Sequence, residues 1–78
     1  MVAQSKVETA LREIYPDCYT AGELAIVLGL GTSDSARRAV LRACQRALKY
    51  GTIERYEITN PIGERMTPMT LWGAVVEG

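Results

Sequence analysis

The chain has 78 residues, of which 47% are hydrophobic and 23% are charged; these proportions are typical of a globular domain and exclude a disordered tail. Nine basic residues balance nine acidic ones, so the formal net charge is zero, and there is no histidine. The chain therefore lacks the commonest general base and the commonest metal ligand. We predict no enzyme activity and no catalytic residues, no metal site and no cofactor.

We predict a single domain over residues 1–78, because a chain of this length buries one modest core. No apolar run approaches the roughly 20 residues of a membrane span, and the charged N-terminus lacks the apolar stretch of a signal peptide. The two cysteines, Cys18 and Cys44, are too far apart for a CxxC metal motif. These features favour a cytoplasmic protein with no membrane partner.

The first predicted helix starts at Ser5. The sequence SKVE over residues 5–8 fits a capping box, in which the side chains of Ser5 and Glu8 each satisfy a free backbone N–H group. We expect this helix to end before Pro16. Its apolar residues recur at spacings of four and three, as on one face of a helix: Val7, Leu11 and Ile14.

A short second helix is predicted after Thr20. The sequence TAGE over residues 20–23 is a second capping box, and Gly29 is placed to end the helix. The residues just before it, DCYT (17–20), favour a short strand. The expected buried face of the second helix consists of Leu24, Val27 and Leu28.

A longer third helix is predicted to begin after Thr32 or Ser33, to run to Lys49 or Tyr50, and to stop at Gly51. With about 100° of rotation per residue, its apolar residues gather on one side, where Cys44 is expected as a buried thiol. This apolar side consists of Ala36, Val40, Ala43, Cys44, Ala47 and Leu48.

The outer face of this third helix collects most of the positive charge of the chain. Residues 32–50 contain five basic residues and one acidic residue, whereas each flanking segment contains two basic and four acidic residues. Arg46 falls at the margin of the outer face, and Arg37 lies nearer the apolar boundary. The pattern predicts an amphipathic helix with a basic face, for which a merely solvated surface is the alternative. The outer face consists of Arg38, Arg42, Gln45 and Lys49.

Two antiparallel strands are predicted after the third helix. The segments TIERYEIT (52–59) and MTLWGAVV (69–76) are rich in β-branched and aromatic residues. Between them NPIGERMTP (60–68) contains two prolines and a glycine, which predict a long loop. Trp72 and the four tyrosines are expected in the core or at its edge. The loop region is unusually apolar, so it either folds back on the domain or forms a partner-binding patch: Ile62, Met66 and Met69.

In this order, the elements resemble the winged helix-turn-helix family of DNA-binding domains. The resemblance rests on YTAGELAIVLGLGTSDSARRAVLRACQRALKYGTIERYEI followed by TLWGAVV, and its pattern covers about residues 5–76. It is carried best by ELAIVLGLG, a short helix with a turn entered through glycine, and by ALKYGTIER, where the long helix passes into a strand. The family implies an α+β fold in which three helices precede a two-stranded β-hairpin wing.

The resemblance also implies that the third helix enters the major groove of double-stranded DNA. The start of this helix offers free backbone N–H groups suited to a phosphate, although Asp34 there opposes phosphate. Arg37 and Arg38 lie where base-reading side chains are expected, and arginine can hold guanine with two hydrogen bonds. The other predicted DNA contacts are Ser33 and Ser35 at phosphate or base, Arg42 at bases or backbone, Arg46 and Lys49 flanking the groove, and Arg65 in the wing.

We expect a sequence-specific DNA-binding protein that regulates transcription as a repressor or accessory factor of bacterial, phage or mobile-element type, associated with the nucleoid. One module makes few phosphate contacts, so a homodimer or another protein partner is expected. Two alternatives remain open. The neutral charge and the apolar loop favour a winged helix that binds proteins, as a subunit or inhibitor of a host complex. An excisionase-like architectural protein would share the DNA chemistry.

Overall fold

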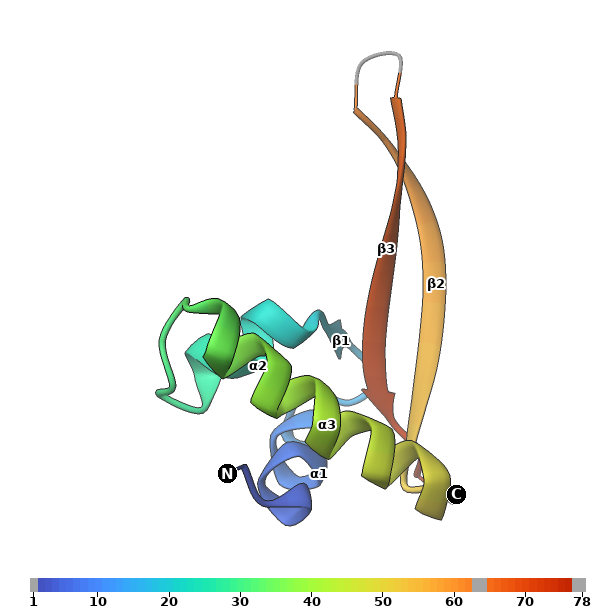
Figure 1. Cartoon of the computed structure of the whole chain (residues 1–78). Coiled ribbons are helices and arrows are strands. Elements are labelled where there is room, and N and C mark those ends of the chain that lie inside the picture. Colours follow the sequence, from blue (N-terminus) through green and yellow to red (C-terminus); the bar gives the residue numbers. More distant parts are fainter. Residues whose placement is uncertain (1, 63–64, 77–78) are drawn as a thin grey trace.

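The helices lie together at one end of a long β-hairpin (Figure 1). The computed structural model describes residues 2–62 and 65–76, and the side chains of residues 60–67 are outside the description. Within these residues the chain is a small α+β fold with three helices and a three-stranded antiparallel sheet. None of the described helices is long and apolar enough to cross a membrane. In chain order the elements are α1 (Gln4–Glu13), β1 (Cys18–Tyr19), α2 (Ala21–Val27), α3 (Asp34–Tyr50), β2 (Ile53–Ile62) and β3 (Arg65–Ala74).

Helix α1 lacks the predicted capping box. Its N-cap is Ala3, which makes no side-chain capping bond, so Ser5 lies within the first turn. Glu8 instead accepts hydrogen bonds from Nε2 of Gln4, at 3.1 Å, and from the hydroxyl of Thr52. The prediction failed because the carboxylate ties α1 to the turn after α3 and does not cap its own helix.

Helix α2 begins as predicted, but its buried face differs from the predicted one. Oγ1 of Thr20 accepts a hydrogen bond from the N–H of Glu23 at 3.1 Å, and the Glu23 carboxylate accepts one from the N–H of Thr20 at 3.0 Å, which confirms the capping box. Val27, predicted to be buried, is 52% exposed. Helix α2 packs against α3, and Val27 lies outside the face that α2 buries. The inward face consists of Ala21, Leu24 and Ala25.

Both α2 and α3 end at a glycine in the left-handed region, as predicted. Gly29 has φ +76° and Gly51 has φ +79°, a conformation that favours glycine because it has no β-carbon. After α2, the N–H of Leu30 donates to the carbonyl of Ala25 at 2.8 Å. This bond is typical of a Schellman motif. After α3, the N–H of Thr52 makes the equivalent bond to the carbonyl of Ala47. Local sequence chemistry therefore sets both helix ends.

The β2–β3 hairpin is more regular than predicted. The pairing runs from Ile53 opposite Ala74 to Ile62 opposite Arg65, so residues 60–62 and 65–68 are strand and not the predicted long loop. Pro61 pairs with Met66, and Pro68 pairs with Thr59, so the two pairs lie two positions apart along the hairpin. Proline is tolerated in a strand where its nitrogen faces away from the partner strand. These prolines therefore do not end the strands.

The short strand β1 lies on the other side of β3, which gives the sheet order β1-β3-β2. Cys18 pairs with Gly73, and Tyr19 pairs with Trp72, which confirms the predicted short strand before α2. The core lies between the helices and this three-stranded base of the sheet. Its fully buried side chains include Val7, Leu11, Leu24, Val40, Cys44, Ile53 and Trp72.

The aromatic residues divide between the core and the surface. Trp72 is buried and Tyr19 is partly buried against the core, as predicted. The prediction is wrong for the other tyrosines, because Tyr15, Tyr50 and Tyr56 are 52%, 75% and 44% exposed. Of these, Tyr50 ends α3, and Tyr56 points to the face of the hairpin opposite to that of the buried Ile53, because side chains alternate along a strand. Neither position is covered by the helices.

Candidate nucleic-acid interface

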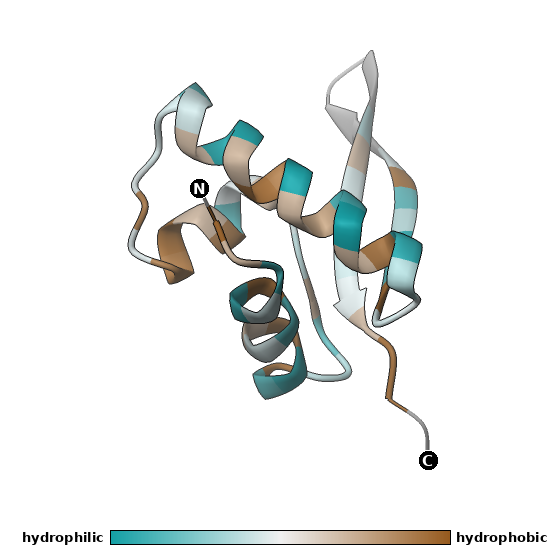
Figure 2. Cartoon of the chain, turned by 60° about the horizontal axis from the view of Figure 1, so that its bottom comes forward, coloured by the Kyte–Doolittle hydropathy of each residue, from teal (hydrophilic) through white to brown (hydrophobic). Residues whose placement is uncertain are grey.

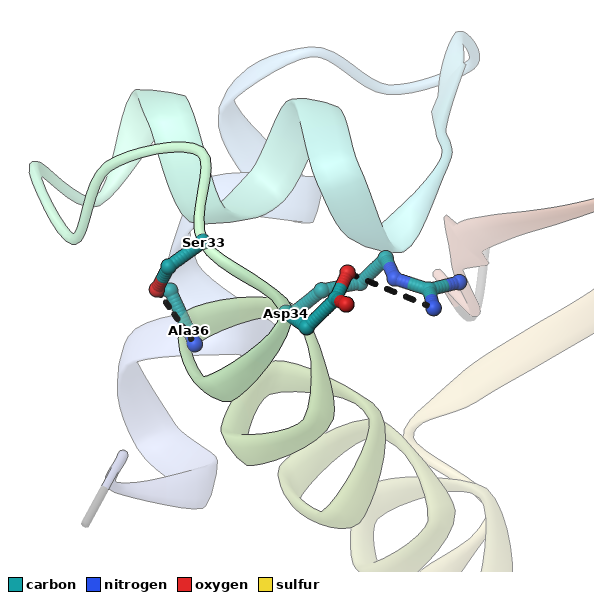
Figure 3. Close-up of polar contacts among 4 residues, drawn as sticks. Ser33, Asp34 and Ala36 are labelled. Carbon is teal, nitrogen blue, oxygen red and sulfur yellow. Dashed lines mark hydrogen bonds and ion pairs between the residues drawn. The ribbon is translucent and has the colours of Figure 1, made fainter.

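The start of α3 is capped by Ser33 (Figure 3). Oγ of Ser33 accepts a hydrogen bond from the N–H of Ala36 at 3.1 Å, which confirms the predicted cap. The hydroxyl proton of Ser33 is still available as a donor to a ligand. Asp34 and Ser35 are exposed in the first turn. Two hydroxyl groups, one carboxylate and the free N–H groups of the first turn therefore meet at this end of α3.

Three basic residues form an exposed row along the outer side of α3, which we call the basic row: Arg38, Arg42 and Lys49. Helical geometry places them within about 40° of one another around the axis and about 16 Å apart from first to last. They lie opposite the side that α3 buries, and Figure 2 shows hydrophilic and hydrophobic residues alternating along this helix. In the described part of the chain, no acceptor or carboxylate pairs with any of the three.

Arg37 lies to one side of the basic row. Its Nη2 is 3.9 Å from Oδ1 of Asp34, and the two side chains are 54% and 82% exposed, so the ion pair is loose and contributes little to stability. About 100° of rotation separates Arg37 from Arg38. Arg37 borders a hollow of about 440 Å³ between α2, α3 and β3, whose other lining residues include Thr20, Gly22, Leu41, Thr70 and Trp72. The two predicted base readers thus leave the helix in different directions.

Arg46 has an internal partner that the sequence did not reveal. Its Nη2 donates a hydrogen bond to the backbone carbonyl of Val2 at 2.9 Å, and Val2 is 6% exposed. The guanidinium therefore holds the segment before α1 against α3. A backbone acceptor 44 positions away leaves no local pattern in the sequence, so only the fold reveals this contact.

The remaining predicted contact, Arg65, is placed only in part. Its backbone opens β3 opposite Ile62, and its side chain lies outside the described residues. Of the eight predicted DNA-binding residues, the structure places Ser33 and Ser35 exposed at the start of α3 and the basic row on its outer side, and it sends Arg37 and Arg46 towards other elements.

The two cysteines are not activated nucleophiles. Burial raises the pKa of Cys44 to about 12, so its thiol stays protonated at neutral pH, as expected of a structural thiol. The pKa of Cys18 is also raised, first by loss of solvent and then by the carboxylates of Asp17 and Glu54. In residues 2–62 and 65–76, no three metal-ligating side chains gather into a group that could hold a metal ion.

An exposed apolar group at the end of α2 was missed by the sequence analysis. Ile26, Val27 and Leu30 are 59%, 52% and 43% exposed. The signal is present in the sequence, because the uninterrupted apolar run from Leu24 to Leu28 is wider than the single face that a seven-residue helix can bury. At least part of that run had to remain in contact with solvent.

Comparisons of the chain with protein-family models, with curated proteins and with solved structures find no match.

Proposed function

We propose that this protein is a winged helix-turn-helix protein that binds double-stranded DNA and regulates transcription, as a repressor or accessory factor. Helix α3 would lie in the major groove, and the β2–β3 hairpin would be the wing. The observation that carries the proposal is the basic row, which presents Arg38, Arg42 and Lys49 on the exposed side of the longest helix. A row of cations that has no charged partner among the described residues and lies opposite a buried face suits a polyanion.

The arrangement of the helices supports this proposal. A short α2 precedes a 17-residue α3, and α2 packs directly against it. In a helix-turn-helix protein the second of two such helices enters the major groove, which is about 12 Å wide and admits one α-helix. The hairpin extends away from the helices beside α3 (Figure 1), where a wing would lie.

The distribution of charge along α3 suggests a division of labour. Arg38 lies in the second turn, near the hydroxyl groups of Ser33 and Ser35, and the N-terminal part of a recognition helix is the part that meets base edges. Lys49 lies in the last turn, about 16 Å further along the axis. We therefore assign Arg38 to base reading, Lys49 to the phosphate backbone, and Arg42 to either.

The proposal is tested by measuring affinity for a DNA duplex over a series of salt concentrations by fluorescence anisotropy. Each phosphate contact contributes about −0.9 to the slope of log affinity against log salt, so phosphate contacts by Lys49 and Arg42 predict a slope near −2 or steeper. Lys49→Ala reduces the magnitude of the slope by about 0.9. Lys6→Ala, an exposed control on α1, leaves the slope unchanged. A slope near zero for the unmodified protein contradicts the proposal.

A second candidate function, binding to a protein partner, is favoured by one observation. The exposed apolar group of Ile26, Val27 and Leu30 resembles the apolar centre of a protein interface. If partner binding is the main function, Ile26→Ser abolishes binding to the protein partner. In that case the slope of log DNA affinity against log salt is near zero for the unmodified protein. An excisionase-like architectural role would use the same basic row as a regulator, and a DNA-bending assay with a bound duplex separates these two.

A further inference from the structure

The outer edge of β2 has no partner strand among the described residues, because the sheet order is β1-β3-β2. The N–H of Val75 donates to the carbonyl of Thr52 at 3.1 Å, and this pair continues the register of β2 with β3. Backbone groups of an antiparallel strand alternate between its two sides, so the even-numbered residues of β2 bond to β3. The odd-numbered residues turn their N–H and C=O groups to the free edge: Ile53, Arg55, Glu57 and Thr59.

The two prolines of the hairpin agree with this alternation and show which edge is open to pairing. Pro61 is odd-numbered, so its missing N–H falls on the free edge of β2, beyond Thr59. Pro68 pairs with Thr59, so its nitrogen faces the opposite edge, on the part of β3 that extends past β1. That edge of β3 is interrupted, whereas the edge of β2 keeps its donors and acceptors from Ile53 to Thr59.

We propose that β2 pairs edge to edge with β2 of a second copy of this chain, in antiparallel orientation, about a twofold axis at Tyr56. In this register Arg55 faces Glu57 of the second copy, and Ile53 faces its Thr59. The four odd-numbered residues of each strand then form hydrogen-bonded pairs, which supply about eight backbone hydrogen bonds. The two sheets become one continuous sheet of six strands.

The charges on this edge are complementary to themselves. Nε of Arg55 lies 3.9 Å from Oε1 of Glu57 in the same chain, and these side chains are 50% and 67% exposed, so they share one face of β2 and stay solvated. Across the twofold axis, two arginines and two glutamates alternate, and each directly opposite pair joins unlike charges. Such cross-strand pairs are favourable, and like charges directly opposite are unfavourable.

The same charges disfavour the neighbouring registers. An axis at Arg55 places the two copies of Arg55 opposite each other, and an axis at Glu57 places the two copies of Glu57 opposite each other. An axis at Ile58 sets Arg55 opposite Pro61, which offers no N–H. Register in an exposed ladder is often weakly specified, but here the sequence of β2 favours the axis at Tyr56 over these three.

The other face of β2 gains from the same arrangement. Tyr56 and Ile58 are 44% and 46% exposed, although both are large apolar side chains. With the axis at Tyr56, the two tyrosine rings lie side by side in a non-hydrogen-bonded pair, where cross-strand side chains are closest. Pairing thus covers an apolar surface and satisfies the open edge, which otherwise is a site for unspecific strand addition.

The test is sedimentation velocity without DNA, from about 10 µM to about 1 mM, a range that covers weak association. We expect the unmodified chain to form a dimer. Arg55→Glu and Glu57→Arg each place two pairs of like charges across the axis, and each raises the dissociation constant about tenfold or more. An equimolar mixture of these two variants forms a heterodimer, because the altered chains again place opposite charges across the axis.

Two controls and a second readout accompany this test. Lys6→Glu and Glu13→Arg make the same changes of charge at exposed positions of α1, and they leave the dimer unchanged. Hydrogen exchange of the amides of Arg55 and Glu57 slows as protein concentration rises, whereas that of Tyr56, already bonded to β3, does not change. A chain that stays monomeric throughout, a dimer that neither charge reversal weakens, or a mixture that does not associate overturns the proposal. Because no step involves DNA, none of these results bears on the proposed DNA binding.

Discussion

The sulfur of Cys18 lies 2.8 Å from the position that a β-carbon on Gly73 would occupy. The two residues are paired directly across β1 and β3, and a carbon of the Tyr56 ring lies 3.4 Å from the same position. Real β-carbons essentially never come so close to a neighbouring atom. The absence of a side chain at Gly73 therefore lets β1 join the sheet.

Replacing Gly73 by alanine is expected to destabilise the protein by about 1–3 kcal/mol, because the added methyl group overpacks a filled site. The measurement is urea denaturation of Gly73→Ala, of Cys18→Ala and of the double variant. Cys18→Ala removes the sulfur. Gly73→Ala should therefore destabilise a chain that already carries Cys18→Ala less than it destabilises the unmodified chain, with a difference of about 1 kcal/mol or more. Gly22→Ala is the matched control, because its β-carbon meets its nearest neighbour at an ordinary 3.9 Å. Purely additive costs would contradict the contact.

The link between α1 and the turn after α3 makes stability depend on pH. The pKa of Glu8 lies below its ordinary value, chiefly because the Thr52 hydroxyl donates a hydrogen bond to its carboxylate and then because the Gln4 amide does. A lowered pKa means that this stabilisation is fully present above the unfolded pKa of about 4.3. It is lost as the pH falls through the lower folded pKa.

We therefore expect Thr52→Val to lose about 1 kcal/mol of unfolding free energy at pH 7, and to differ less from the unmodified protein near pH 3. Denaturation curves at both pH values measure this difference. Thr52→Ser keeps the hydroxyl and should keep the pH dependence of the unmodified chain. A loss for Thr52→Val that is equal at both pH values would show that Glu8 is not the partner that matters.

Arg46 is expected to contribute to stability through the carbonyl of Val2, its acceptor at 2.9 Å. Arg46→Ala should lower the free energy of unfolding by about 1 kcal/mol. Arg42→Ala, one turn earlier and without an internal partner in the described part of the chain, should change it by less than about 0.5 kcal/mol. Chemical denaturation compares the two variants, and equal losses would contradict the structural role given to Arg46.

Base reading and phosphate binding should separate when binding sites are selected from random DNA. Arg38→Ala is expected to change the selected sequence, and the loss of a guanine contact costs about 1–3 kcal/mol on the preferred site. Lys49→Ala should weaken binding to all sequences alike. If Arg38→Ala selects the same sequence as the unmodified protein, the assignment of Arg38 to base reading is wrong.

Features whose causes are local could be predicted from the sequence. The capping box at Thr20, the cap at Ser33 and the stop at Gly51 each depend on residues within four positions, so their spacing was enough. The buried side of α3, which includes Cys44, also followed from the helical period. For the same reason, the exposure of the basic row could be predicted before its surroundings were known.

Features that depend on distant partners could not be predicted. Glu8 was expected to cap its own helix, but Thr52, 44 positions away, engages it. Pro61 was read as a loop residue, because whether a proline nitrogen faces a partner strand depends on the register. The contact of Cys18 with Gly73 likewise exists only once β1 has joined β3. In the candidate site, the diversion of Arg46 to Val2 has the same origin.

The most direct test of the central claim is the affinity of Arg38→Ala/Arg42→Ala for a DNA duplex at low salt. The matched control is Lys6→Ala/Arg12→Ala, which removes the same charge from exposed positions on α1. We expect the unmodified protein and the control to bind. Loss of Arg38 and Arg42 should weaken binding by about tenfold or more, and it should flatten the salt dependence by about 0.9, because Arg42 is the one of the two that is assigned to a possible phosphate contact. Absence of binding to any duplex by the unmodified protein, or equal affinities for the two double variants, would contradict the central claim.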